Sequence, residues 1–229
     1  YYVDISPSIL ALLIQVLNQP LIKADSKWDT VNFNGPCTFV RRGVTLLAAD
    51  NEGFCAEDDI QIFASSVASL PVSLRVRRSP DILECLFNSP HLAMKRLNLT
   101  EMKLSTLACS RFADLVPRCT SLFDLHIESC DFEEPLFVAT ALAEASNLVR
   151  ICFRRVCTSH RRQKKLSNIL FYRENCIVSQ LLHPPSRLRT LILQQMCLED
   201  GHFLVIVDML PTSQLRVLDV SHNNIGHEG

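Results

Sequence analysis

The chain has 229 residues, of which 48% are hydrophobic and 21% are charged, values typical of a soluble globular protein with a sizeable core. Its formal net charge of -1 argues against a chain that is basic throughout and bound to nucleic acid, so any electrostatic function must be regional. No apolar run reaches the roughly 18 residues that a membrane-spanning helix requires, so we expect no membrane span.

Residues 1–43 are predicted to form an amino-terminal cap made of a helix and short strands. Ser6-Pro7 begins a helical stripe of apolar side chains within residues 1–23, because proline suits the first turn of a helix. Residues 24–43 alternate in polarity and turn at Asn34-Gly35-Pro36, which predicts a pair of short strands.

A repeated pattern begins at residue 44 and is clearest in LRVLDVSHNNI, residues 215–225. Its first, fourth, sixth and eleventh positions are apolar, and its ninth position is Asn223. The fourth and sixth positions are expected to alternate on a short strand with one buried side, while the Asn223 amide bonds the backbone where the chain turns away. The apolar first, fourth and sixth positions recur in units that start at residues 44, 71, 94, 122, 148, 188 and 215.

Stripes of apolar residues at helical spacing follow the predicted strands. Two examples are Phe112, Leu115 and Val116 in one unit and Phe203, Ile206, Val207 and Leu210 in another. Each unit is therefore predicted to contain a strand, a turn and a helix.

This pattern is the leucine-rich repeat template, and the units near 27 or 28 residues resemble the ribonuclease-inhibitor-like class over residues 44–229. The resemblance implies an α/β solenoid of about seven repeats, shaped as a horseshoe, with parallel strands on the concave face and helices on the convex face. It also implies that the concave face binds other proteins. Two departures are that asparagine stands at the ninth position only at Asn223, and that Pro71 opens a shortened unit.

The chain begins without methionine and stops at Gly229, four residues after Ile225. An uncapped last repeat would leave apolar surface exposed. We therefore expect the chain to be a fragment of a longer protein.

The third, fifth and seventh positions of each unit should form the concave face, because equal positions of stacked parallel strands stand side by side. Their charges alternate along the face, and we predict that they bind a partner. The predicted residues are Arg75, Arg77, Arg96, Asp124, His126, Glu128, Arg150 and Arg154.

Two pairs of oppositely charged residues occupy equal template positions in neighbouring units of this predicted face. They are Asp124 with Arg150 and Glu128 with Arg154. One interpretation is that they form ladder pairs within the chain, each contributing roughly 0.2–1 kcal/mol. The other is that they form a polar landing surface, centred on His126, on which a partner's charges exchange with them.

The enlarged repeat at 148–187 contains about a dozen extra residues, and its segment 150–165 has seven cations and no acidic residue. A solvated loop and a binding site are both compatible with this charge. We predict a basic loop that binds an acidic protein segment through Arg155, Arg161, Arg162, Lys164 and Lys165. Nucleic acid ranks lower because aromatic side chains that stack on bases are scarce nearby.

The run SHRR at 159–162, which opens the extra residues, resembles a similar run at the start of an enlarged repeat in the actin capping-protein linker family of cytoskeletal scaffolds. This resemblance implies a place in a cytoskeletal assembly.

Ten cysteines occur without a CxxC pair or a signal peptide, so we expect free thiols in the reducing cytoplasm. Seven histidines lack the spacing of zinc ligands, and we expect no metal and no cofactor. Cys152, near Cys157 and His160, is a candidate nucleophile whose pKa the surrounding arginines could lower. Because no oxyanion site is recognisable, we expect no enzyme activity and no small-molecule substrate.

The sequence thus predicts a non-catalytic scaffold that binds other proteins, as a subunit of a larger intracellular assembly. Two alternatives stay open. Residues 5–17, followed by Trp28, resemble part of an F-box, which implies the substrate-recognition subunit of a ubiquitin ligase, although the stretch is too short for three helices. The other alternative is a sensor or GTPase-activating regulator in which Arg154 acts in trans.

Overall fold

The computed structural model describes the chain in ten parts. These are residues 2–3, 30–33, 37–41, 45–50, 73–78, 83, 86, 92–156, 166–171 and 176–226.

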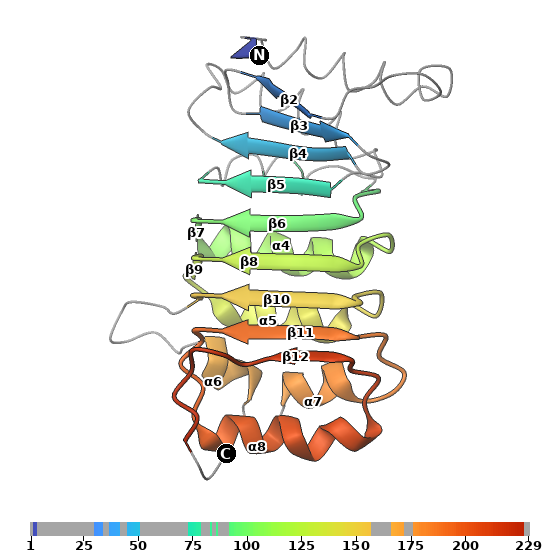
Figure 1. Ribbon diagram of the computed structural model, residues 1–229, viewed down its shortest axis with the longest axis vertical. Helices are drawn as coiled ribbons and strands as arrows, with labels where there is room; N and C mark the ends of the chain where they lie inside the picture. The colour runs from blue at the N-terminus through green and yellow to red at the C-terminus, as the bar shows by residue number, and fades with distance from the viewer. Residues whose placement is uncertain are drawn as a thin grey trace.

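A ten-stranded sheet runs through the whole described structure (Figure 1). In spatial order its strands are β1 (Tyr2–Val3), β2 (Thr30–Phe33), β3 (Cys37–Arg41), β4 (Thr45–Asp50), β5 (Ser73–Arg77), β6 (Arg96–Thr100), β8 (Asp124–Glu128), β10 (Arg150–Arg154), β11 (Thr190–Gln194) and β12 (Val217–Asp219). From β4 to β12 every neighbouring pair is parallel. Two further short strands, β7 (Lys103–Leu104) and β9 (Asp131–Phe132), pair in parallel beside it.

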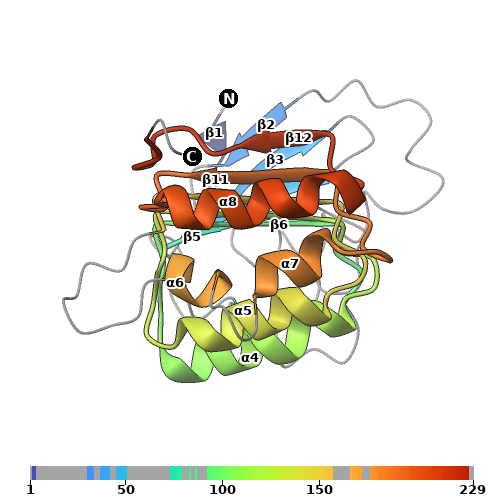
Figure 2. The ribbon, with the colours of Figure 1, turned by 90° about the horizontal axis from the view of Figure 1, so that it is seen from below.

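The described helices lie together on one face of the sheet (Figure 2). They are α4 (Thr106–Arg118), α5 (Pro135–Glu144), α6 (Leu166–Leu170), α7 (Ile177–Leu182), α8 (Asp200–Met209) and the 3-10 helix η3 (Leu210–Thr212). This arrangement of a parallel sheet and helices confirms the predicted α/β class.

The strand register follows the predicted template. Leu74, Leu97, Leu125, Ile151 and Leu191 share the fourth position and stand side by side on successive strands. Each of them is at most 1% exposed. The strand that contains Leu74 is regular in spite of Pro71, so the shortened unit keeps its place in the sheet.

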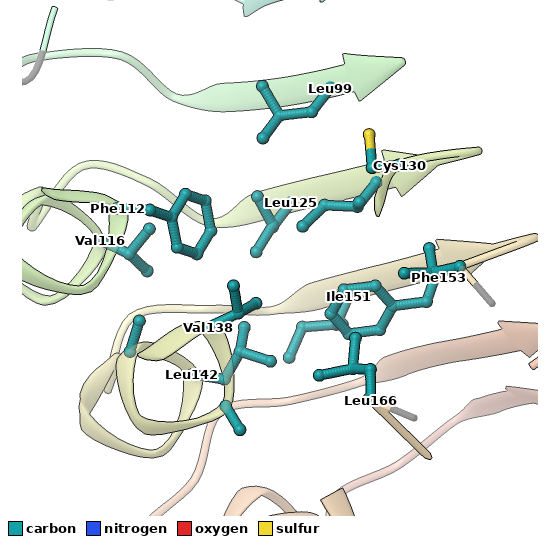
Figure 3. Packing of buried hydrophobic residues seen from close by; sticks show 14 of the residues in the cluster. Leu99, Phe112, Val116, Leu125, Cys130, Val138, Leu142, Ile151, Phe153 and Leu166 are labelled. Atoms are coloured by element: carbon teal, nitrogen blue, oxygen red, sulfur yellow. The ribbon is translucent and has the colours of Figure 1, made fainter. Parts of the chain in front are cut away.

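The buried sides of the strands pack against the helices (Figure 3). Leu125 of β8 points toward Phe112 and Val116 of α4, and Ile151 of β10 points toward Val138 and Leu142 of α5. All of these side chains are at most 2% exposed and belong to one continuous cluster. The stripe predicted around Phe112 is therefore the core-facing side of a helix.

A left-handed residue follows each strand of the ten-stranded sheet from β5 onward, at the eighth position of the template. The residues are Arg78, Glu101, Ser129, Arg155, Gln195 and His222, with φ between 52° and 60°. The conformation costs a non-glycine residue roughly 1–2 kcal/mol. The cost is offset by cross-strand hydrogen bonds: the N–H of Glu101 donates to the carbonyl of Glu128 at 2.9 Å, and that of Ser129 to the carbonyl of Arg154 at 2.9 Å.

The Asn223 side chain bonds the backbone as predicted. Its Oδ1 accepts hydrogen bonds from the N–H groups of Met196 (2.8 Å) and Leu198 (3.1 Å) in the preceding unit. Its Nδ2 donates to the carbonyls of Leu193 (2.6 Å) and Val220 (2.7 Å).

The enlarged unit contains two short helices, α6 and α7, whereas the described units that follow β6 and β8 have one α-helix each, α4 and α5. The apolar residues of α6 and α7 face the core, with Leu166 and Leu170 at most 1% exposed and Ile177 at 8%. Residues 157–165 and 172–175 of this unit lie outside the described residues.

The stripe at 203–210 forms a helix as predicted, α8 with η3, but most of it is not covered. Of the stripe predicted in α8 and η3, only Ile206 is buried, while Val207 is 39% and Leu210 is 36% exposed. Leu218 of β12 is also only partly buried, whereas the equivalent Leu191 is 1% exposed. The reason is that no further described element packs on the outer side of this unit.

Near the amino end, β2 and β3 pair antiparallel, which confirms the strand pair predicted in residues 24–43. The helix predicted within residues 1–23 lies outside the described residues. The role of residues 1–43 as a cap stays a prediction.

Candidate protein-binding face

The face of the sheet opposite the described helices carries the predicted site residues. We call it the polar face and define it as the third, fifth and seventh template positions on β5, β6, β8, β10, β11 and β12. Side chains at these positions alternate along each strand with the buried fourth and sixth positions, as in the pattern of β8, where Leu125 and Ile127 are buried and Asp124, His126 and Glu128 are partly exposed. All eight predicted polar-face residues lie on four consecutive strands.

Asp124 lies between two arginines on the neighbouring strands. Arg96 of β6 and Arg150 of β10 are both in register with it. The distance from Arg96 Nε to Asp124 Oδ2 is 3.6 Å, and that from Arg150 Nε to Oδ1 is 3.9 Å. Both distances are beyond hydrogen-bond range, so the pairing is loose. The arginine side chains are 48% and 47% exposed, whereas Asp124 is recessed at 14%.

The Asp124–Arg150 ion pair of the ladder interpretation is thus present. Glu128 and Arg154 stand in register as predicted, but no ion pair joins them in the described part of the chain. The guanidinium that bonds the Glu128 carboxylate belongs to Arg155. Arg155 has a left-handed backbone directly after β10, which lets its side chain reach back to the end of β8. Its hydrogen bond lowers the pKa of Glu128.

This contact also changes the interpretation of Arg155. It was predicted in a basic loop, but it belongs to the end of the sheet and is paired within the chain. The other predicted loop residues, Arg161, Arg162, Lys164 and Lys165, lie outside the described residues, and their role stays a prediction.

His126 occupies the centre of the polar face, with its Nε2 3.7 Å from Glu128 Oε2. Burial lowers the pKa of His126, against the opposing effect of the Glu128 carboxylate. Both His126 Nε2 and Arg154 Nε are buried atoms without a hydrogen-bond partner among the described residues. Leaving a buried polar atom without a hydrogen bond is costly to the folded state.

Cys152 is in register with His126 and is fully buried beneath the longer side chains of this face. Burial raises the pKa of the Cys152 thiol, although Arg154 and Arg150 act in the opposite direction. The arginines therefore do not activate it, because desolvation has the larger effect. Cys109, Cys119, Cys130, Cys152, Cys176 and Cys197 are all free thiols.

At the amino-terminal side of the face, Glu101 holds two arginines at the strand ends. Its carboxylate lies 3.0 Å from Arg77 Nη2 and 2.6 Å from Arg78 Nη2. The hydrogen bonds from these arginines lower the pKa of Glu101. Arg75, two positions before Arg77, is exposed.

At the other side of the face the groups are mainly uncharged. Gln194 Nε2 donates to Asp219 Oδ2 at 2.5 Å and to Ser221 Oγ at 3.1 Å. The Ser221 N–H donates to Asp219 Oδ1 at 3.0 Å, and this contact lowers the pKa of Asp219. The uneven charge of the face therefore lies on β5, β6, β8 and β10.

Not all charged residues at the edge of the polar face were predicted from the sequence. Arg78 and Glu101 were not predicted, and Arg155 was assigned to the basic loop. The signal that could have found them is their common eighth position, one step after the strand. None of them is glycine, so the sequence did not mark the left-handed turn.

Within the described parts of the chain, no group of three or more His, Cys, Asp or Glu residues is placed to hold a metal ion. None of the described helices combines the length and apolar character needed to cross a membrane.

Comparison of the sequence with models of known protein families gives no match, and comparison with curated proteins gives none either. The repeat pattern and the geometry of the polar face therefore carry the functional assignment.

Proposed function

We propose that the chain is a non-catalytic protein-interaction scaffold of ribonuclease-inhibitor-like leucine-rich repeats, and that its polar face binds a protein partner with an acidic segment. The helices on the other face would then form the convex side of a horseshoe. The template spacing and the continuous parallel register from β4 to β12 support this class.

The observation that carries the proposal is the excess of cations at the centre of the polar face. Two carboxylates lie there, Asp124 and Glu128, beside four arginines. Arg96 and Arg150 share Asp124, Arg155 bonds Glu128, and Arg154 is in register with Glu128 without an ion pair to it among the described residues. Arg96 and Arg150 are half-exposed and loosely paired. Acidic side chains of a partner would complete the hydrogen bonding of these two guanidinium groups.

The cytoplasm, with a cytoskeletal assembly as one candidate setting, belongs to the same proposal. Its support is the set of free thiols, four of which are buried in the described structure, together with the SHRR resemblance. Reduced cysteines are usual in that compartment.

The proposal is tested by binding of a labelled polyglutamate peptide to the full chain, measured by fluorescence anisotropy at several salt concentrations. We expect binding that weakens as salt rises, and no binding of polylysine. The double variant Arg96→Glu/Arg150→Glu should weaken polyglutamate binding by about tenfold or more, because two attractive charges become repulsive.

A matched control is Lys103→Glu/Arg118→Glu, which makes the same change of net charge at exposed positions on β7 and at the end of α4. We expect it to change affinity by less than about twofold. Equal losses in the two double variants would show that only net charge matters and would refute the polar face as the binding site.

The basic loop needs a separate test. Reversing the charges of Arg161, Arg162, Lys164 and Lys165 together should weaken polyglutamate binding and flatten its salt dependence if the loop takes part. Unchanged binding would remove the loop from the site and leave the polar face.

A further inference from the structure

Three alternating charges form a straight row across the polar face. Arg96, Asp124 and Arg150 occupy the same template position on β6, β8 and β10 and are paired in register. Neighbouring strands are about 4.8 Å apart, so the two arginine positions are separated by about 9.6 Å with the carboxylate midway. A partner that matches the row needs the charges negative, positive, negative at the same spacing.

The row is open to a partner on its outer members and recessed at its middle. Arg96 and Arg150 are half-exposed, while Asp124 is 14% exposed. Arg96 is also held over the ring of Phe123, with its guanidinium carbon 5.5 Å from the ring centroid, which limits its movement. Short acidic side chains can meet the arginines, but only a long cation can reach Asp124.

Between β6 and β11 the next row on the face carries no permanent charge, and the charged Arg75 on β5 and Asp219 on β12 continue it at its two ends. It contains Asn98, His126, Cys152 and Ile192, which are in register on β6, β8, β10 and β11. Cys152 is fully buried and Ile192 is 7% exposed, so the side chains of this row project less from the face than those of the charged row. An element lying across the strands can rest on this row while its charged side chains meet the charged row.

Among regular backbone conformations, the α-helix fits this spacing. Residues three or four apart on a helix are about 5–6 Å apart on one side, and residues seven apart are about 10.5 Å apart along the axis. An extended strand places same-side residues about 6.6 Å apart, which fits neither step. A polyproline II helix returns to the same side after about 9.3 Å and leaves nothing opposite Asp124.

We propose that the partner lays an amphipathic α-helix across β6, β8 and β10, with acidic residues at positions i and i+7 and a lysine or arginine at i+4. This inference rests on the proposed function and specifies its partner. The acidic residues pair with Arg96 and Arg150, and the central cation pairs with Asp124. The charge order gives the helix one register on the face, since a one-turn shift puts like charges together.

The test uses two alanine-rich peptides of about 20 residues, long enough to form helix in isolation. Both contain two Glu and one Lys; in the first they stand at i, i+7 and i+4, and in the second at i, i+5 and i+2, which spreads them around the helix. Circular dichroism checks that the two are equally helical. The full chain should bind the first about tenfold more tightly, measured by fluorescence anisotropy.

The central contact is tested by a double-mutant cycle between Asp124→Asn and the Lys→Gln form of the first peptide. Each change alone should weaken binding by about fivefold. The two changes together should weaken binding only slightly more than either one alone, because both remove the same contact. Thermal unfolding of Asp124→Asn provides the check that the variant is folded, because asparagine has nearly the same shape.

Equal affinity for the two peptides, or additive losses in the cycle, would overturn the helix proposal. Polyglutamate binding that still depends on Arg96 and Arg150 would then leave the proposed function standing. Failure of both peptides and of polyglutamate to bind would overturn both.

Discussion

At the scale of single residues, Asn223 differs from the residues that share its template position. Met102, Cys130, Val156 and Met196 are at most 2% exposed and fill the same place with apolar side chains. Asn223 instead connects the last described turn to the preceding unit through backbone hydrogen bonds. A polar and an apolar residue at this position thus both stabilise the turn. The polar residue forms hydrogen bonds with the backbone of the turn, and the apolar residue packs beneath it.

Replacing Asn223 with alanine should lower the free energy of unfolding by about 2–3 kcal/mol, because the N–H groups of Met196 and Leu198 lose their acceptor. Urea denaturation followed by circular dichroism measures the change. Asn224→Ala is the control, since the Asn224 side chain is exposed. Equal effects of the two substitutions would contradict this role of Asn223.

His126 should make stability depend on pH. Burial lowers its pKa in the native state, so the unfolded chain binds more protons as the pH falls through the ordinary histidine range near about 6.5. The free energy of unfolding should therefore be highest above that range and decrease as the pH falls toward the native pKa, by less than about 1.4 kcal/mol per pH unit.

The measurement for His126 is urea denaturation at pH 7.5 and 5.5. His126→Gln should lose less stability between these values than the parent chain, because glutamine does not titrate. His222→Gln, at an exposed turn position, is the control and should keep the parental pH dependence. A parental pH dependence in His126→Gln would be evidence against the buried imidazole as its source.

At the scale of elements, α4, α5 and α8 begin where a local signal meets an apolar pattern. The clearest case is α4: the Oγ of Ser105, the N-cap residue, accepts a hydrogen bond from the N–H of Ala108 at 3.2 Å. The hydrogen bond satisfies one of the free N–H groups of the first turn. The helix then buries Phe112, Leu115 and Val116 against the sheet.

Ser105→Ala should destabilise the chain by about 1 kcal/mol through loss of this cap. Ser105→Asp should recover most of the loss, because a carboxylate also caps and favours the positive end of the helix. Thermal unfolding compares the three proteins. If alanine and aspartate had equal effects, the hydrogen bond to Ala108 would not be the stabilising contact.

At the scale of the whole molecule, strands in the middle of the sheet are covered on both edges, and β12 at its end is not. Its residue Val217 is 49% exposed, and Leu204 on α8 is 48% exposed. In the stacked arrangement a unit gains much of its stability from its neighbours. Stability should therefore decrease from the central strands toward β12.

Hydrogen exchange followed by mass spectrometry tests this gradient. Amides of β8 and β10 should exchange at least about tenfold more slowly than those of β12, since opening a central strand exposes more apolar surface. Uniform protection across these strands would mean that the described sheet opens only as one cooperative unit.

The sequence by itself determined the periodic parts of the molecule. The apolar fourth and sixth positions, such as Leu125 and Ile127, predicted the strands and the polar face, because burial of one side of a strand leaves little choice of register. The resemblance to leucine-rich repeats implied that the strands are parallel. The hydrogen bonds of Asn223 were also predictable, since its amide has both a donor and an acceptor to place.

Only the tertiary structure decided how the charges pair and which apolar residues are covered. Glu128 bonds Arg155 and not the in-step Arg154, because the left-handed backbone of Arg155 redirects a long side chain at the strand end. Val207 and Leu210 fit the helical pattern but stay exposed, since burial depends on a neighbouring element. Periodicity reports which side of an element is apolar; contacts between elements determine what that side meets.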